Sequence, residues 1–129
     1  MSYHYSTHLH MPWEQAVERV RSGLQEAGFG IVSEIDVRQT FAKKLAVDFR
    51  PYLILGACNP RYAHQAILAE RHIGTMLPCN VVLQEDRDGS IEVSAIDPVA
   101  SMQAVGNPGL ATLARDVQEQ LRQFIAALP

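Results

Sequence analysis

Cysteine is scarce in this chain, which has 129 residues and only two cysteines, Cys58 and Cys79. Two cysteines cannot build the disulfide framework that holds small secreted domains together. The sequence also has no Cys-x-x-Cys and no His-Glu-x-x-His spacing, so the common zinc-binding motifs are missing. We therefore expect two free thiols in a reducing cytoplasm, and neither a bound metal nor another cofactor.

Long apolar runs and an excess of positive charge are missing as well. The apolar runs fall far short of the ~20 residues of a membrane span, and no succession typical of a secretion signal opens the sequence. The chain has 11 Lys and Arg against 14 Asp and Glu, a formal net charge of −3. Nucleic-acid affinity depends mainly on neutralising phosphates, so we expect a cytoplasmic protein with neither nucleic acid nor membrane as partner.

What the chain does have is the composition and periodicity of one α+β domain over residues 1–129. Hydrophobic residues make up 47% and charged residues 19%, as in globular domains. Alternating or continuous apolar segments predict about five strands, over residues 3–9, 29–37, 52–57, 79–85 and 91–97. Helical spacing predicts helices over residues 13–27, 38–46, 60–72 and from 108 onward. The predicted order is β-α-β-α-β-α-β-β-α, with two long helices and a C-terminal helix packed on the sheet.

Three expectations concern the faces of these elements. In the strand 29–37, alternation places Ile31, Ser33 and Ile35 on one face. In the short helix 38–46, Phe41 and Leu45 should point inward. The last helix carries a narrow apolar stripe that should cover the sheet, with a partner helix as the alternative.

The segment Leu55-Gly56-Ala57-Cys58-Asn59-Pro60 predicts a strand that turns directly into a helix. Asn is a good N-cap and Pro suits the first helical position, so Cys58 should precede the helix. The positive end of a helix lowers thiol pKa values, which makes Cys58 a candidate reactive thiol or part of an anion-binding turn. The alternative is a small packing residue, since free cysteines are often buried.

A second thiol lies in Leu77-Pro78-Cys79-Asn80-Val81, at the start of a predicted strand. If the two segments meet, they form a small polar pocket with five candidate ligand-binding residues, namely Cys58, Asn59, Pro60, Cys79 and Asn80. Asn amides and a helix N-terminus would suit a carboxylate or phosphate. Three interpretations stay open: a non-enzymatic small-ligand domain, a thiol-based redox enzyme or sensor with Cys58 and Cys79 as catalytic candidates, and purely structural turns.

Histidines offer weaker candidates. His64 lies five residues past the expected cap and should point away from Cys58. His4, His8 and His10 share one face of the first strand, but His4 and His8 lie roughly 13 Å apart at ~3.3 Å per residue. His8 and His10, about 6.6 Å apart by the same spacing, would need further ligands. We therefore predict no metal site here.

The apolar and cysteine-containing blocks resemble those of the bacterial and archaeal domain-of-unknown-function family DUF302. The resemblance runs from Tyr3 into the last helix and is most specific in Cys58-Asn59-Pro60 and Pro78-Cys79-Asn80. It implies a small single-domain α+β protein that forms a homodimer. It implies no catalytic residue, because the activity of the family is not established, and the three N-terminal histidines lie outside its pattern.

Overall fold

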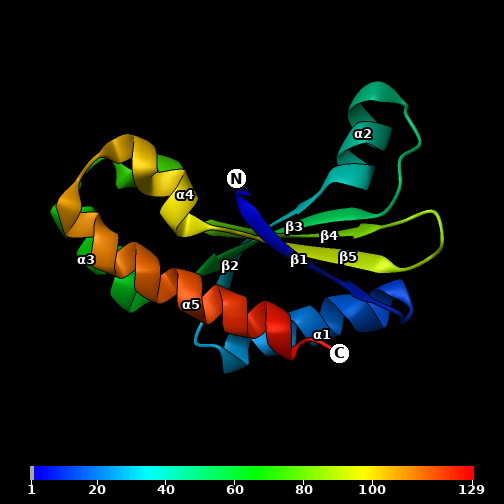
Figure 1. The fold of residues 1–129 in the computed structure, drawn as a ribbon. Helices are drawn as coiled ribbons and strands as arrows, with labels where there is room; N and C mark the ends of the chain where they lie inside the picture. The colour runs from blue at the N-terminus through cyan, green and yellow to red at the C-terminus, as the bar shows by residue number, and fades with distance from the viewer. Residues whose placement is uncertain (1) are drawn as a thin grey trace.

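The computed structural model describes residues 2–129 and contains one five-stranded antiparallel sheet (Figure 1). The strand order across the sheet is β1-β5-β4-β3-β2. The strands are β1 (His4–Leu9), β2 (Gly30–Asp36), β3 (Tyr52–Cys58), β4 (Cys79–Glu85) and β5 (Ile91–Ile96). The predicted α+β class and the predicted strands are confirmed, with ends shifted by a residue or two.

Two helices cover one face of this sheet. Helix α1 (Trp13–Glu26) and helix α5 (Ala111–Ala127) lie on the same side (Figure 1). Both are amphipathic and bury their apolar stripes, as a sheet with one apolar face requires. The buried side chains are Ala16, Val20 and Leu24 from α1, and Ala114, Leu121, Phe124 and Ile125 from α5. The stripe of the last helix therefore packs on the sheet.

Alternate residues of the middle strands form the other half of the core. Leu53, Leu55 and Ala57 of β3 are buried, and so are the corresponding alternate residues of β4 and β5: Cys79, Val81, Leu83, Ile91, Val93 and Ala95. The residues between them point to the opposite face, which neither α1 nor α5 covers. This second face is called the open face below.

A bulge in β2 corrects the predicted alternation of that strand. Ile31 pairs with Ala57 on the core side, but the register shifts before Ser33, which pairs with Gly56. A bulge adds one unpaired residue and so moves the following side chains to the other face. Ile35 is therefore on the open face and 50% exposed.

Helix α2 (Val37–Leu45) is also oriented differently from the prediction. It projects from the sheet on its own, away from α1 and α5 (Figure 1). Phe41 contacts Phe49, with ring centroids 5.1 Å apart, but Leu45 is 65% exposed and no side chain of α2 is buried. The expectation that Leu45 faces the core is wrong, because no other part of the described chain packs over it.

The remaining helices form a smaller layer at one end of the sheet. Helix α3 (Pro60–Ala69) is shorter than predicted, and a short 3-10 helix, η1 (Ile73–Met76), follows it. Helix α4 (Pro98–Met102) was not predicted, and the short turns η2 (Gln103–Val105) and η3 (Pro108–Leu110) lead into α5. Ala66, Ile73 and Leu110 form a small second core here.

Candidate ligand-binding site

The end of β3 and the start of α3 have the local structure that the sequence predicts. Cys58 is the last residue of β3 and pairs with Gly30 of β2. Asn59 is the N-cap of α3: its Oδ1 accepts a hydrogen bond from the backbone N–H of Arg61 at 3.2 Å. Pro60 occupies the first helical turn, where its missing N–H costs nothing.

The start of β4 lies directly beside this turn. Ala57 pairs with Cys79, and Gly56 pairs with Asn80. The ring of Pro78 lies close over β3: a Cβ added to Gly56 would approach Pro78 Cγ to 2.6 Å and would also collide with the Ser33 hydroxyl. Glycine at position 56 therefore lets the two cysteine-containing segments come together.

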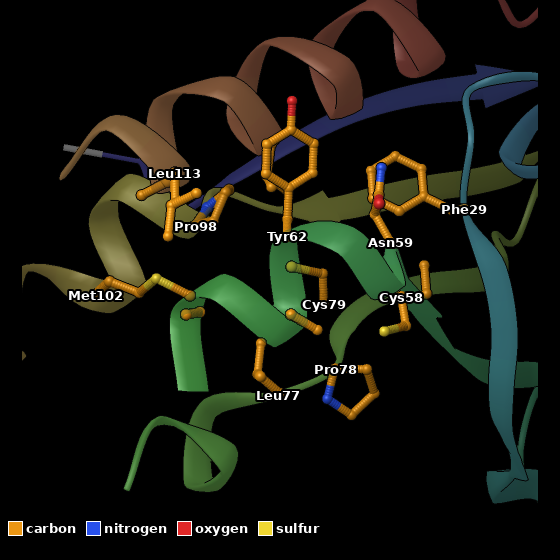
Figure 2. A pocket seen from close by; sticks show the side chains of 15 residues that line it. Phe29, Cys58, Asn59, Tyr62, Leu77, Pro78, Cys79, Pro98, Met102 and Leu113 are labelled. Carbon is orange, nitrogen blue, oxygen red and sulfur yellow. The ribbon is translucent and has the colours of Figure 1, made fainter. Parts of the chain in front are cut away.

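These segments border a cavity of about 40 Å³ (Figure 2). Its lining comes from β3, α3, α4, α5, the start of β4 with the segment before it, and the residue before β2, namely Phe29, Ala57, Cys58, Asn59, Tyr62, Ala63, Ala66, Leu77, Pro78, Cys79, Pro98, Met102, Leu113, Ala114 and Val117. Its volume exceeds the roughly 10–15 Å³ that one water molecule needs. The lining is almost wholly apolar and includes no Lys, Arg or His from the described residues.

The cavity therefore differs in chemistry from the polar pocket that we expected. Cys58, Asn59 and Cys79 line it, but Pro60 and Asn80 do not. Asn80 follows Cys79 in β4 and so points to the open face, where it is exposed. The side-chain oxygen of Asn59, Oδ1, already accepts the N-cap hydrogen bond from Arg61 N–H. His64 is exposed and lies outside the lining, as expected.

Most of the apolar lining was missed in the sequence. Tyr62 and Ala63 of α3 meet Leu113 and Val117 of α5 only in the folded chain. The sequence did contain a signal for the helix that begins at Pro98. Asp97-Pro98, like Asn59-Pro60, places a polar N-cap residue directly before a proline. The structure makes Asp97 the N-cap of α4, with Oδ1 accepting a hydrogen bond from Val99 N–H at 3.0 Å.

The two thiols differ in their surroundings, and both are free. Cys79 is buried, whereas Cys58 is partly exposed. Burial, with a smaller contribution from the nearby Cys58, raises the pKa of the Cys79 thiol to about 11. Ala57 and Cys79 are paired in the β3–β4 ladder, so their side chains lie on the same face of the sheet. Cys58 follows Ala57 in β3, so its side chain points to the opposite face. Figure 2 shows the Cys58 sulfur on the side of Pro78.

Comparison with known proteins gives a family and a fold. The family described as "Domain of unknown function DUF302" matches residues 5–128. The crystal structure of an uncharacterized conserved DUF302 protein from Bacillus stearothermophilus is 24% identical, with 100% of both chains covered and a TM-score of 0.91. No curated protein matches. No helix of residues 2–129 is long and apolar enough to cross a membrane.

Proposed function

The chain belongs to the DUF302 family, and we propose that it is a homodimeric binding domain whose cavity takes the apolar end of a small ligand. The observation that carries this proposal is the apolar cavity between β3, α3 and α5. This space has room for a small apolar group beside the side chains that line it. A ligand group placed there would remove apolar surface from water, which is favourable at roughly 25 cal/mol per Å².

The chemistry of the lining favours an apolar group over the carboxylate or phosphate considered from the sequence. An anion needs positive charge or free N–H donors, and the lining residues include no cationic side chain. Pockets for small molecules combine apolar walls with a few polar groups that fix orientation. Asn59 is the lining residue whose side-chain amide could supply such a polar contact.

Chemical-shift mapping by NMR tests this proposal with xenon and n-butanol as apolar probes and inorganic phosphate as the anionic probe. We expect the apolar probes to shift resonances around Ala63 and Ala114 in a saturable way, and phosphate to leave them unchanged. The variant Ala63→Leu should abolish the effect by filling the cavity. Ala126→Leu, at an exposed position of α5 outside the lining, should bind like the wild type.

Two results would contradict the apolar-ligand proposal. Xenon and butanol shifts that scatter over the surface, or that persist in Ala63→Leu, would show that the cavity does not bind them. Saturable phosphate shifts centred on Asn59 would instead support the anion interpretation.

The thiol-based role is the alternative interpretation of the same site. Both cysteines line the cavity, but the reactive form of a cysteine is its thiolate. The raised pKa of Cys79 makes that thiol a poor nucleophile at neutral pH, so a thiol-based role would depend on Cys58 as the reactive group. Alkylation rates against pH for the wild type, Cys58→Ser and Cys79→Ser distinguish the two interpretations: fast alkylation at neutral pH that disappears in Cys58→Ser would support the thiol-based role.

The dimer part of the proposal rests on α2 and the open face. Isolated helices shorter than about 12–15 residues are marginal in water, and α2 has 9 residues, none of them buried. Leu45 and Val47 beside it, and Val32 and Ile35 of β2, are all exposed apolar side chains. A second copy packed over this region would cover them and stabilise α2.

A further inference from the structure

Three metal-ligating side chains meet at the end of the sheet opposite the cavity. They are His8 of β1, Asp86 in the turn between β4 and β5, and Glu92 of β5, near the β4–β5 turn in Figure 1. His8 Nε2 lies 3.0 Å from Asp86 Oδ2 and 3.6 Å from Glu92 Oε2. All three donor atoms lie within 4.8 Å of one another.

Backbone pairing holds these three residues in place. His8 and Glu92 are direct partners in the β1–β5 ladder, so their side chains point to the same open face. The turn is closed by Asp86 N–H donating to Ser90 O at 2.8 Å and Gly89 N–H donating to Asp86 O at 3.0 Å. The donors therefore come from a folded hairpin and its neighbouring strand.

We propose that His8, Asp86 and Glu92 bind a divalent transition-metal ion of the zinc class. A tetrahedral ion about 2.0–2.2 Å from each donor requires donors roughly 3.4 Å apart. The observed 3.0 and 3.6 Å separations bracket that value. Imidazole with carboxylates is a ligand set that zinc accepts, and three protein ligands leave the fourth position for water.

The surroundings of Glu92 support this assignment. Gln84 Nε2 donates to Glu92 Oε1 at 3.4 Å, and Ser94 Oγ donates to the same oxygen at 3.5 Å. These contacts orient the carboxylate and leave Oε2 directed at His8. Outer contacts of this kind position metal ligands in known sites. The two carboxylates and a neutral imidazole also balance the charge of a divalent cation.

The other N-terminal histidines take no part in this site. His4 Nδ1 contacts Ser6 Oγ at 2.8 Å, and His10 is exposed and absent from the cluster. The other two ligands, Asp86 and Glu92, lie 78 and 84 residues after His8 in the sequence. The spacing of histidines within β1 could therefore not indicate this cluster.

Titration of the full chain with Zn²⁺ alone tests the proposal, using calorimetry and the ¹⁵N resonances of the histidine rings. We expect saturable binding of one ion and a shift of the His8 ring nitrogens, with the rings of His4 and His10 unchanged. His8→Ala and Glu92→Gln should each weaken binding at least about tenfold, since loss of outer-shell partners alone costs 10–100-fold. The side chains of His8 and Glu92 are 45% and 30% exposed, so these two variants should fold.

Matched variants separate this site from other zinc ligands in the chain. His10→Ala removes a histidine outside the cluster, and Cys58→Ser removes the accessible thiol; both should bind as the wild type does. The proposal is overturned if Zn²⁺ does not bind saturably, if binding survives both His8→Ala and Glu92→Gln, or if Cys58→Ser abolishes it.

Discussion

The Cys79 thiol is buried between the sheet and the helices, next to a cavity that is itself apolar. Removing a thiolate from water is unfavourable, so burial, and then the nearby Cys58, raise the pKa of this thiol from 9.0 to about 11. The raised pKa connects the protonation of one residue to the stability of the whole domain.

At the residue scale we therefore predict a loss of stability in alkali that depends on Cys79. A thiol whose pKa is raised in the folded state stabilises the fold below its unfolded pKa of about 9 and loses that contribution as the pH rises through 11. The loss should reach about 2–3 kcal/mol at 1.36 kcal/mol per pKa unit. Urea unfolding at several pH values measures it.

Other groups titrate in the same range, so the control is Cys79→Ala. The difference in unfolding free energy between wild type and Cys79→Ala should shrink from neutral pH to pH ~11. A difference that stays constant over this range would show that the thiol is not perturbed by burial.

Helix α3 begins at the cavity, and its N-cap sets both the helix start and part of the lining. Asn59 accepts the Arg61 N–H through its side chain and also borders the cavity. At the other end of α3, Asn107 Nδ2 donates to Ala69 O at 3.0 Å, which joins the helix to the segment that precedes α5. Two asparagines thus hold both ends of one element.

At the element scale we predict that Asn59→Ala lowers the unfolding free energy by about 1 kcal/mol, the usual value of an N-cap. Asn59→Asp is the matched control, because aspartate caps helices as well as asparagine does, and it should cost much less. Urea denaturation followed by circular dichroism measures both. Equal losses in the two variants would contradict the role of Asn59 as a cap.

The whole molecule has one covered face and one uncovered face. Helices α1 and α5 close the core side of the sheet, while the open face carries α2 at one corner. Several apolar side chains on β2 and α2 stay exposed among residues 2–129. At this scale the proposed dimer accounts for the position of α2.

We predict that the wild type is a dimer in solution and that Leu45→Glu makes it a monomer. A charge at a buried interface position is strongly unfavourable, and Leu45 is 65% exposed in the single chain. Leu68→Glu is the control, since Leu68 of α3 is even more exposed, at 74%, but lies on another element. Light scattering after size-exclusion chromatography gives the masses. A monomeric wild type, or a dimeric Leu45→Glu, would contradict the dimer.

The elements and their caps could be predicted because the signals are local. Alternation over a few residues marked β1 and β2, a nearly continuous apolar run marked β3, and helical spacing marked α1 and α5. Asn59-Pro60 marked the start of α3 for the same reason: the N-cap bond closes between Asn59 and Arg61, two residues apart. The bulge in β2 could not be predicted from alternation, because one unpaired residue is enough to move the side chains of Ser33 and Ile35 to the other face of the sheet.

The residues and their local patterns thus determined the family resemblance, the order of the strands and of the longer helices, and the turn that carries Cys58 and Asn59. Only the tertiary structure decided that Asn80 does not line the cavity, that residues of α4 and α5 do, and that His8 lies beside Asp86 and Glu92. The physical reason is the range of the interactions. Helical and strand periodicity is set by neighbours within about four residues, whereas a cavity and a ligand cluster depend on strand register and on packing between segments far apart in the chain.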